Sequence, residues 1–410
     1  IAMSVLKNTL TLNDALRISK PLRFNMMFKP IGSVCNLNCN YCYYLDKAKM
    51  YSDNSVMSLD LIEKIIKEYI QINDNEQIVF DWHGGEPLLL GLGYFKKIIE
   101  LQNKYKGNKQ ILNTLQTNAT LLNADFAKFF KDNGFLLGIS IDGPQDIHDK
   151  YRRDKGDNST FIRVMKGIEL LHRYDVDFNT LTTISKVGEG RGLEVYKFMK
   201  SIGSHFMQFM PVLECVNPYN NSIVPPDEKN SAMASWSVNP LEYGKFMCDI
   251  FDYWVKYDVG GYFVNLFDST LANYCGVNPG TCVYSETCGS NAVVEHNGDV
   301  YPCDHFVYEQ YKIGNINDSS LQEIMSSEKI TVFGIDKRNS LPLKCIKCKY
   351  FSLCHGECPK HRFGESGLNS LCEGLYYFYS HVEPYMLKMK SLLFEGKEAK
   401  LIMNFDTLSL

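Results

Sequence analysis

The feature that most restricts the fold of this chain is a regular alternation of short β-rich runs with amphipathic helical segments, from Phe24 to Leu213. Ile62, Ile65 and Ile66 follow the i, i+3, i+4 spacing of a helix for which Ser58 is the expected N-cap, and similar patterns lie within 123–134, 161–171 and 195–202. The predicted strands between them are Phe24–Lys29, Gln77–Trp82, Gln110–Thr117, Phe135–Ile141, Asp177–Thr183 and Phe206–Val212. Repeated strand–helix units indicate a parallel sheet with right-handed crossovers.

Six units are too few for a complete eight-stranded barrel, which typically takes ~250 residues. The predicted fold class is therefore α/β, a partial (β/α)6 TIM-like barrel with its chemistry at the carboxyl ends of the strands. After Leu213 the chain becomes a polar loop over 215–240, then a helix over 240–257, and from Cys275 it is turn-rich. We divide it into an N-terminal extension (1–23), the barrel (24–213), a connecting segment (214–274), a cysteine-rich domain (275–385) and a tail (386–410).

Composition excludes several classes of protein. Apolar residues make up 45% of the chain, which is typical of a folded globular protein. Forty-three Lys and Arg against forty-seven Asp and Glu leave a net charge of −4, which offers no strong field for nucleic acid or an anionic membrane. No run approaches ~18 consecutive apolar residues, and the N-terminus lacks the apolar core of a signal peptide. We expect a cytoplasmic protein with no nucleic-acid or membrane partner, and nothing requires more than a monomer.

The fourteen cysteines are clustered. Three lie between Cys35 and Cys42, nine lie between Cys275 and Cys372, and only Cys215 and Cys248 stand apart. In a reducing compartment such clusters bind metal or perform redox chemistry more often than they form disulfides. Metal binding is therefore the working hypothesis.

The first cluster has the spacing C-x3-C-x2-C over Cys35, Cys39 and Cys42, directly after the first predicted strand. A closed structural zinc site normally has four protein ligands, so zinc would need a distant fourth cysteine. A 4Fe–4S cluster held by three cysteines would instead leave one iron open to an outside ligand. We favour the iron–sulfur interpretation.

The second region contains the regular run C-x2-C-x5-C-x3-C-x13-C, starting at Cys345. Ala292–His296 and Asp299–Cys303 flank Asn297-Gly298 and predict a type I′ hairpin that brings Cys288 and Cys303 towards each other. Without Cys275, eight ligands remain for two four-cysteine centres. On spacing alone, both iron–sulfur clusters and zinc satisfy this pattern.

The first motif, followed by the aromatic Tyr43, resembles the radical S-adenosylmethionine (SAM) enzymes. In that family SAM occupies the open iron, and one electron cleaves it to a 5′-deoxyadenosyl radical. Gly84-Gly85-Glu86-Pro87 after the second strand and Ser140 in Ser-Ile-Asp-Gly-Pro match further family motifs. The SAM contacts that this resemblance implies are Tyr41, Gly85, Ser140, Arg152 and Leu213.

The second region resembles the SPASM domain, which carries two auxiliary 4Fe–4S clusters, so the resemblance implies three clusters in all. The ligands that it implies for the cluster nearer the substrate are Cys282, Cys288, Cys303 and Cys358. Those for the outer cluster are Cys345, Cys348, Cys354 and Cys372. We expect Cys215, Cys248 and Cys275 to be buried thiols.

Within these enzymes the chain resembles the anaerobic sulfatase-maturating enzymes from about Phe24 to Tyr385. The matching segments are Cys35–Tyr44, Trp82–Pro87, Leu115–Thr120, Ser140–Pro144, Gln208–Phe209 and Val300–Asp304. The resemblance implies oxidation of a sulfatase cysteine or serine to Cα-formylglycine: the radical takes a hydrogen from Cβ, a base takes the S–H or O–H proton, and an auxiliary cluster takes the electron. Asp304 matches the catalytic base, and we expect it in a dry pocket that raises its basicity.

We predict that polar groups at the strand ends form the peptide-facing wall, namely Tyr44, His83, Gln116, Thr117 and Asn118. Each could equally satisfy its own loop. Ala119 departs from the glycine that is common in the family, and we expect its methyl group to narrow the approach of a substrate backbone.

The implied partners are a sulfatase polypeptide and an electron donor such as flavodoxin or ferredoxin. The alternative within the family is a SPASM enzyme that introduces a thioether or another crosslink into a ribosomally made peptide. An alternative of a different class is a zinc-bound protein-interaction module, which predicts no SAM cleavage.

Overall fold

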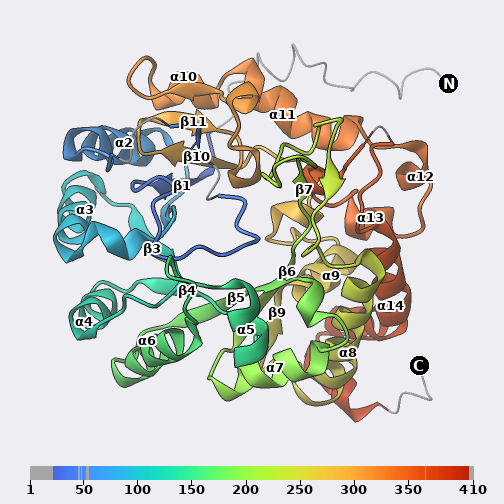
Figure 1. Ribbon diagram of the computed structural model, residues 1–410. Helices are drawn as coiled ribbons and strands as arrows, with labels where there is room; N and C mark the ends of the chain where they lie inside the picture. The colour runs from blue at the N-terminus through green and yellow to red at the C-terminus, as the bar shows by residue number, and fades with distance from the viewer. Residues whose placement is uncertain (1–21, 45–46, 48, 52–54, 365, 406–410) are drawn as a thin grey trace.

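The computed structural model describes residues 22–44, 47, 49–51, 55–364 and 366–405, so most of the predicted N-terminal extension lies outside the described residues. The main sheet has ten strands in the order β12-β11-β10-β1-β2-β3-β4-β5-β6-β9, and β7 pairs with β8 separately (Figure 1). The strands are β1 (Asn25–Lys29), β2 (Gln77–Trp82), β3 (Gln110–Thr117), β4 (Leu136–Ser140), β5 (Phe178–Ile184), β6 (Phe206–Pro211), β7 (Cys215–Val216), β8 (Ala232–Met233), β9 (Phe263–Val264), β10 (Asn291–Glu295), β11 (Asp299–Tyr301) and β12 (Gly314–Asn315).

The central strands β1 to β6 are the six predicted strands, and β2 and β3 have the predicted bounds. They pair in parallel and in chain order, which confirms the partial barrel. All carboxyl ends of these strands therefore lie at one rim of the sheet, where the loops that carry function are expected.

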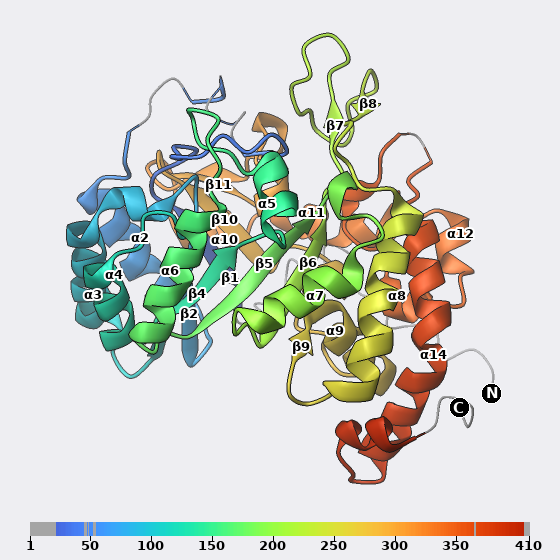
Figure 2. The same cartoon turned by 60° about the horizontal axis from the view of Figure 1, so that its bottom comes forward.

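Helices cover the outer face of this curved sheet (Figures 1 and 2). The helices that the structure describes, including those of the cysteine-rich region, are α2 (Leu59–Ile72), α3 (Leu92–Tyr105), α4 (Ala124–Asp132), α5 (Gln145–Tyr151), α6 (Phe161–Arg173), α7 (Gly192–Ser201), α8 (Pro240–Tyr257), α9 (Asn265–Cys275), α10 (Leu321–Met325), α11 (Glu328–Asn339), α12 (Leu343–Ile346), α13 (Phe351–Cys354) and α14 (Cys372–Phe394). The Ser58 side chain caps α2 by accepting from Leu61 N at 3.2 Å, as predicted. The isoleucines of the predicted stripe in α2 are buried in the core.

The C-terminal hairpin extends the barrel sheet, an arrangement that the sequence did not indicate. Strand β10 pairs in parallel with β1, and the register sets Glu295 beside Lys29. At the other edge β9 pairs in parallel with β6. The cysteine-rich region is thus joined to the barrel by backbone hydrogen bonds between strands that lie far apart in the chain.

The predicted type I′ turn of this hairpin is wrong. Val294 pairs with Val300, so the loop is one residue longer than a two-residue turn. Gly298 N donates to Glu295 O at 2.9 Å, and Gly298 has φ +90° while Asn297 does not have positive φ. A type I′ turn needs positive φ at both central residues.

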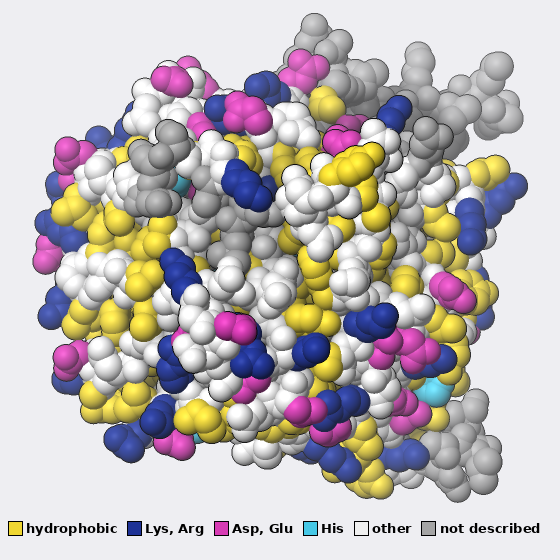
Figure 3. Space-filling view, viewed as in Figure 1, with side chains coloured by type: hydrophobic (Ala, Val, Ile, Leu, Met, Phe, Trp, Pro, Cys, Tyr) yellow, Lys and Arg dark blue, Asp and Glu magenta, His cyan; other side chains and the backbone are white. Residues whose placement is uncertain are grey.

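The predicted loop over 215–240 contains the short pair β7–β8 and projects from the rim of the sheet (Figure 2). On the face in Figure 3, acidic and basic side chains are interspersed, in keeping with the small net charge. Among the described helices, none combines the length and the apolar character that a membrane crossing requires.

Candidate active site

The first cysteine motif lies in the loop between β1 and α2, at the carboxyl rim. Cys35 and Cys42 act electrostatically on Cys39, so the three thiols lie close together. Burial raises the pKa of Cys35 to about 11 and that of Cys39 to about 12. Thiols in such surroundings stay protonated unless a positively charged centre binds them, and metal binding supplies that charge.

The Gly-Gly-Glu-Pro segment holds this loop against the end of β2. A Cβ atom on Gly85 would lie 2.1 Å from Val34 O, so the two backbones meet at a distance that only glycine permits. Gly85 N donates to Gly32 O at 2.8 Å, and Glu86 N donates to Val34 O at 3.0 Å. The segment therefore fixes the residues immediately before Cys35.

Glu86 is fully buried beneath the same loop. Its carboxylate accepts from Thr117 Oγ1 at 2.7 Å, from Asn118 N at 2.8 Å and from Leu88 N at 3.0 Å. Burial raises the pKa of Glu86 to about 7 although these hydrogen bonds oppose the shift. Glu86 thus connects the ends of β2 and β3.

A buried network surrounds Arg152 at the ends of β4 and β5. Asp142 accepts from Arg152 Nε at 2.9 Å and from Arg152 Nη2 at 3.0 Å. Asp142 also accepts from the Tyr41 hydroxyl and from Thr183 Oγ1, the latter at 2.5 Å. The Arg152 charge lowers the pKa of Cys39 against the larger effect of burial, so this cation lies near the first cysteine motif.

Residues of the predicted peptide wall form hydrogen bonds to other residues of the protein. Gln116 Nε2 donates to Ser140 Oγ at 2.7 Å, and the Tyr44 hydroxyl donates to both carboxylate oxygens of Glu295, at 2.6 and 2.7 Å. Asn118 Nδ2 donates to Asn36 Oδ1 at 2.9 Å. These side chains lie at the rim, but each already forms a hydrogen bond within the protein.

Ala119 does not narrow the path of a substrate in the way that the sequence predicted. It has φ +59° and is 1% exposed, and its carbonyl oxygen and methyl group lie against Gly167 of α6. The methyl group therefore points into the core. A left-handed backbone normally favours glycine, and the absence of a side chain on Gly167 leaves room for alanine.

Asp304 starts the 3₁₀ turn Asp304–Phe306, directly after Cys303. Its carboxylate forms an ion pair with Lys29 and accepts from the Tyr43 hydroxyl. Because Tyr43 follows Cys42, one tyrosine side chain connects the first cysteine motif to Asp304.

The expected rise in the basicity of Asp304 is wrong. Burial acts to raise its pKa, but the charges of Lys29, His305 and His83 outweigh burial and lower the pKa below its ordinary value. The reason is tertiary: β10 lies beside β1, which brings the ammonium group of Lys29 to the hairpin. His83, another residue of the predicted wall, lies 3.5 Å from Asp81 Oδ1 through its Nε2 atom.

Four of the C-terminal cysteines gather near the hairpin: Cys282, Cys288, Cys303 and Cys358. Burial and then Cys282 raise the pKa of Cys303, and burial, Glu357 and Cys303 raise that of Cys358. His305 Nδ1 lies 3.5 Å from Cys358 Sγ. We call these four cysteines the inner group.

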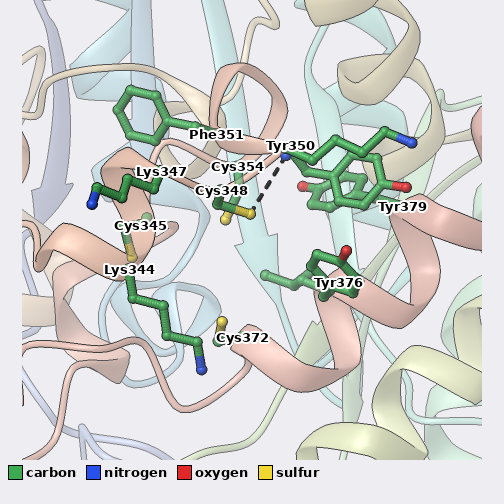
Figure 4. Close-up of a pocket in the computed structure, with 13 residues that line it drawn as sticks. Lys344, Cys345, Lys347, Cys348, Tyr350, Phe351, Cys354, Cys372, Tyr376 and Tyr379 are labelled. Atoms are coloured by element: carbon green, nitrogen blue, oxygen red, sulfur yellow. Dashed lines mark hydrogen bonds between the residues drawn. The ribbon is translucent and has the colours of Figure 1, made fainter.

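The remaining four line a cavity of about 410 Å³ beside α12, α13 and the start of α14 (Figure 4): Cys345, Cys348, Cys354 and Cys372. Burial raises the pKa of Cys354 to about 12, with further contributions from Glu357 and then from Cys372 and Cys345. We call these four cysteines the outer group.

None of the fourteen cysteines forms a disulfide. Within the part of the chain that the structure describes, no three His, Cys, Asp or Glu residues surround a point as the ligands of one metal ion would. The four thiolates of a 4Fe–4S cluster each bind a different iron and lie farther apart, so the gathered groups are compatible with clusters. Cys215 and Cys248 are buried as expected, whereas Cys275, at the end of α9, is partly exposed.

Comparisons with known proteins agree with this geometry. The radical SAM superfamily matches residues 30–199, and SPASM, an iron-sulfur cluster-binding domain, matches residues 282–349. The serine-type anaerobic sulfatase-maturating enzyme of Bacteroides thetaiotaomicron is 46% identical over 92% of this chain and 92% of its own length. The chain belongs to the anaerobic sulfatase-maturating enzymes.

The relatives of this sulfatase-maturating enzyme include both serine-type and cysteine-type enzymes. The cysteine-type enzyme of Clostridium novyi (strain NT) is 37% identical over 82% of this chain and 88% of its own length. The structure of native anSMEcpe with bound AdoMet is 32% identical, covers 90% of this chain and 99% of that chain, and superposes with a TM-score of 0.81. Streptococcus suis SuiB shares only the fold, with 15% identity and a TM-score of 0.59.

Sequence reasoning missed several charged residues of this sulfatase-maturating enzyme. Lys29 ends β1 and contacts Asp304, while Glu214 follows β6 and pairs with Lys360 Nζ at 2.5 Å. Lys360 also lies 4.1 Å from the centroid of the Tyr43 ring. A charged residue at the carboxyl end of a buried barrel strand is the signal that would have found Lys29 and Glu214.

Proposed function

We propose that this enzyme oxidises an active-site cysteine or serine of a sulfatase polypeptide to Cα-formylglycine. The observation that carries the proposal is the 46% identity to a serine-type sulfatase-maturating enzyme over 92% of both chains. The contacts of Asp304 with Lys29 and with Tyr43 support the same chemistry, because they join Cys303 of the inner group to the first cysteine motif.

Cys35, Cys39 and Cys42 would hold a 4Fe–4S cluster whose open iron binds SAM, and this pair would supply the radical that removes a hydrogen atom from the substrate Cβ. Residues proposed to position SAM at the rim are Tyr41, Gly85, Ser140, Arg152 and Leu213. The inner and outer groups would each hold an auxiliary 4Fe–4S cluster. None of these eight thiols forms a disulfide, and each group has the four ligands that such a cluster takes.

Asp304 would remove the S–H or O–H proton of the substrate side chain. Its side chain is 20% exposed, which leaves room for a substrate to approach while Lys29 and Tyr43 contact the carboxylate. Because its pKa is lowered, Asp304 is ionised at neutral pH and can accept a proton, and the same shift makes it a weaker base than an ordinary carboxylate. Loss of a hydrogen atom, a proton and an electron converts a thiol to a thioaldehyde, which water then hydrolyses to the aldehyde.

Cys303 of the inner group directly precedes Asp304, so the proton acceptor would adjoin the site that accepts the electron. We further propose that Tyr44, His83, Gln116, Thr117 and Asn118 exchange some of their present hydrogen bonds for the backbone of an extended peptide. An electron donor such as flavodoxin or ferredoxin would reduce the first cluster, and the enzyme would act in the cytoplasm as a monomer.

The deciding experiment is an anaerobic incubation of the iron-loaded enzyme with SAM, a reductant and paired peptides that differ only in Cys or Ser at the target position. Mass spectrometry follows the peptide and 5′-deoxyadenosine together. An aldehyde at the target residue would support the proposal and identify the substrate type. Formation of 5′-deoxyadenosine without change in either peptide would contradict the sulfatase substrate and leave SAM cleavage intact.

A further inference from the structure

Two buried cations lie in the cysteine-rich region without a carboxylate partner. Lys337 of α11 is 1% exposed, and Arg362 is 9% exposed. Among the described residues, no Asp or Glu oxygen lies within 4.0 Å of either cationic group. By contrast, the buried cations Lys29, Arg152 and Lys360 each have a carboxylate partner.

Backbone carbonyl groups orient both cations. Lys337 Nζ donates to the carbonyl oxygens of Cys282 and Val283, at 2.8 and 2.9 Å. Arg362 donates through Nη1 to Lys337 O at 2.7 Å and through Nη2 to Gly356 O at 3.2 Å. Except for that of Lys337, these carbonyls belong to the segments that carry Cys282, Cys354 and Cys358, so both cations lie against the backbone of the cysteine groups.

Glu357, a buried carboxylate of the same region, is already bound elsewhere. Glu357 Oε2 accepts from Asn369 Nδ2 at 2.6 Å and lies 2.9 Å from His361 Nδ1. An isolated charge in a protein interior is costly, so buried charges are normally paired. Two cations held by neutral carbonyls therefore point to an anionic group that binds between them.

The two cations differ in which cysteines they face. Arg362 Nη2 donates to the carbonyl oxygens of Gly356 and Glu357, at 3.2 and 3.4 Å, on the stretch that joins Cys354 of the outer group to Cys358 of the inner group. Lys337 Nζ donates to the carbonyl oxygen of Cys282, a member of the inner group. Arg362 thus lies between the two groups, and Lys337 lies on the inner side.

We propose that Arg362 is a counter-ion shared by both auxiliary centres and that Lys337 is a counter-ion for the inner centre alone. The inference rests on the proposed function, because it requires a 4Fe–4S cluster in each group. A cluster held by four thiolates carries net negative charge, and reduction adds one electron to it. A nearby fixed cation favours the reduced form and raises the reduction potential.

The test is an EPR-monitored redox titration of the anaerobic, iron-loaded enzyme in which Cys35, Cys39 and Cys42 are alanine, so that only the auxiliary centres contribute. In Arg362→Gln we expect the ratio of reduced to oxidised cluster to fall about tenfold in both centres, when it is measured at the midpoint potential of the parent protein. For one electron this corresponds to a midpoint potential that is lower by about 59 mV. In Lys337→Gln we expect such a fall in one centre only. Arg362→Lys keeps the charge and should leave both midpoints close to those of the parent.

Arg338→Gln is the matched control. Arg338 follows Lys337 on α11, but its side chain is 60% exposed and pairs with Glu286, so both midpoints should remain unchanged. The proposal is overturned if Arg362→Gln shifts neither midpoint or only one, or if Arg338→Gln shifts them as much.

Iron and sulfide analysis covers the case in which a variant loses its clusters. If Arg362→Gln loses both clusters while Arg362→Lys retains them, the requirement for positive charge is supported. Equal loss in both variants contradicts the counter-ion role and indicates a purely structural one. Absence of both auxiliary signals from the parent protein would instead overturn the cluster assignment itself.

Discussion

Lys29 and Asp304 form a partly buried ion pair across the junction of the barrel and the C-terminal hairpin, although 275 residues separate them in the sequence. The pair exists because β10 aligns with β1, which ends at Lys29. It keeps the candidate base ionised, and it joins the two halves of the active site.

Replacement of the candidate base should separate aldehyde formation from SAM cleavage. In Asp304→Asn we expect aldehyde yield to fall by at least about 10²-fold, because an amide cannot accept the substrate proton, while 5′-deoxyadenosine still forms. Mass spectrometry of the peptide together with chromatography of the nucleoside measures both. Asp318→Asn, on an exposed loop residue, should behave as the parent enzyme. Full aldehyde yield from Asp304→Asn would remove Asp304 from the mechanism.

The ion pair should also contribute to stability. Lys29→Met leaves a partly buried carboxylate without its cation, and we expect it to lower the free energy of unfolding by about 1–3 kcal/mol. The comparison is Lys97→Met, which breaks the exposed pair with Glu100 and should change stability by less than about 1 kcal/mol. Denaturant titrations of both variants under one set of conditions measure the difference. Equal effects would show that burial of the Lys29 pair has no energetic consequence.

Gly85 should be required for assembly of the first cluster. In Gly85→Ala the new Cβ atom would overlap Val34 O, 2.1 Å away, and push the loop that precedes Cys35 off the end of β2. We expect loss of SAM binding and a lower iron content, together with a stability loss of about 1–3 kcal/mol. The matched control is Gly93→Ala at the start of α3, where nothing lies within 4 Å. Alanine there should be neutral or stabilise the helix by up to about 1 kcal/mol. Normal SAM binding by Gly85→Ala would contradict the close-approach argument.

Glu86 should make stability depend on pH near neutrality. Burial raises its pKa to about 7 in the folded protein, whereas a glutamate in the unfolded chain has a pKa of about 4. Between these two pH values the folded protein holds a proton on Glu86 and the unfolded chain does not. The Glu86 contribution to stability therefore becomes more favourable as pH falls from about 8 to about 5, by up to about 3 kcal/mol. In Glu86→Gln this dependence should disappear. Thermal unfolding of both proteins over that pH range is the measurement, and parallel pH profiles would disprove the assignment.

Secondary structure and the cysteine motifs could be read from the sequence because both depend on spacing over a few residues. The isoleucine stripe of α2, the bounds of β2 and β3 and the C-x3-C-x2-C run are all local patterns. The turn of the hairpin is a local feature that the same reasoning predicted wrongly. Asn297-Gly298 favours a two-residue turn, but the pairing of Val294 with Val300 across β10 and β11 makes the loop one residue longer.

The partial barrel, the clustered cysteines and the motifs of the family could all be predicted from local patterns in the sequence. The pairing of β10 with β1, the lowered pKa of Asp304 beside Lys29 and the place of Arg362 between two cysteine groups became visible in the folded chain alone. They could not be predicted because the residues near a strand edge do not specify which distant strand will pair with it. Packing selects those partners, and it then sets the charge that each buried group experiences.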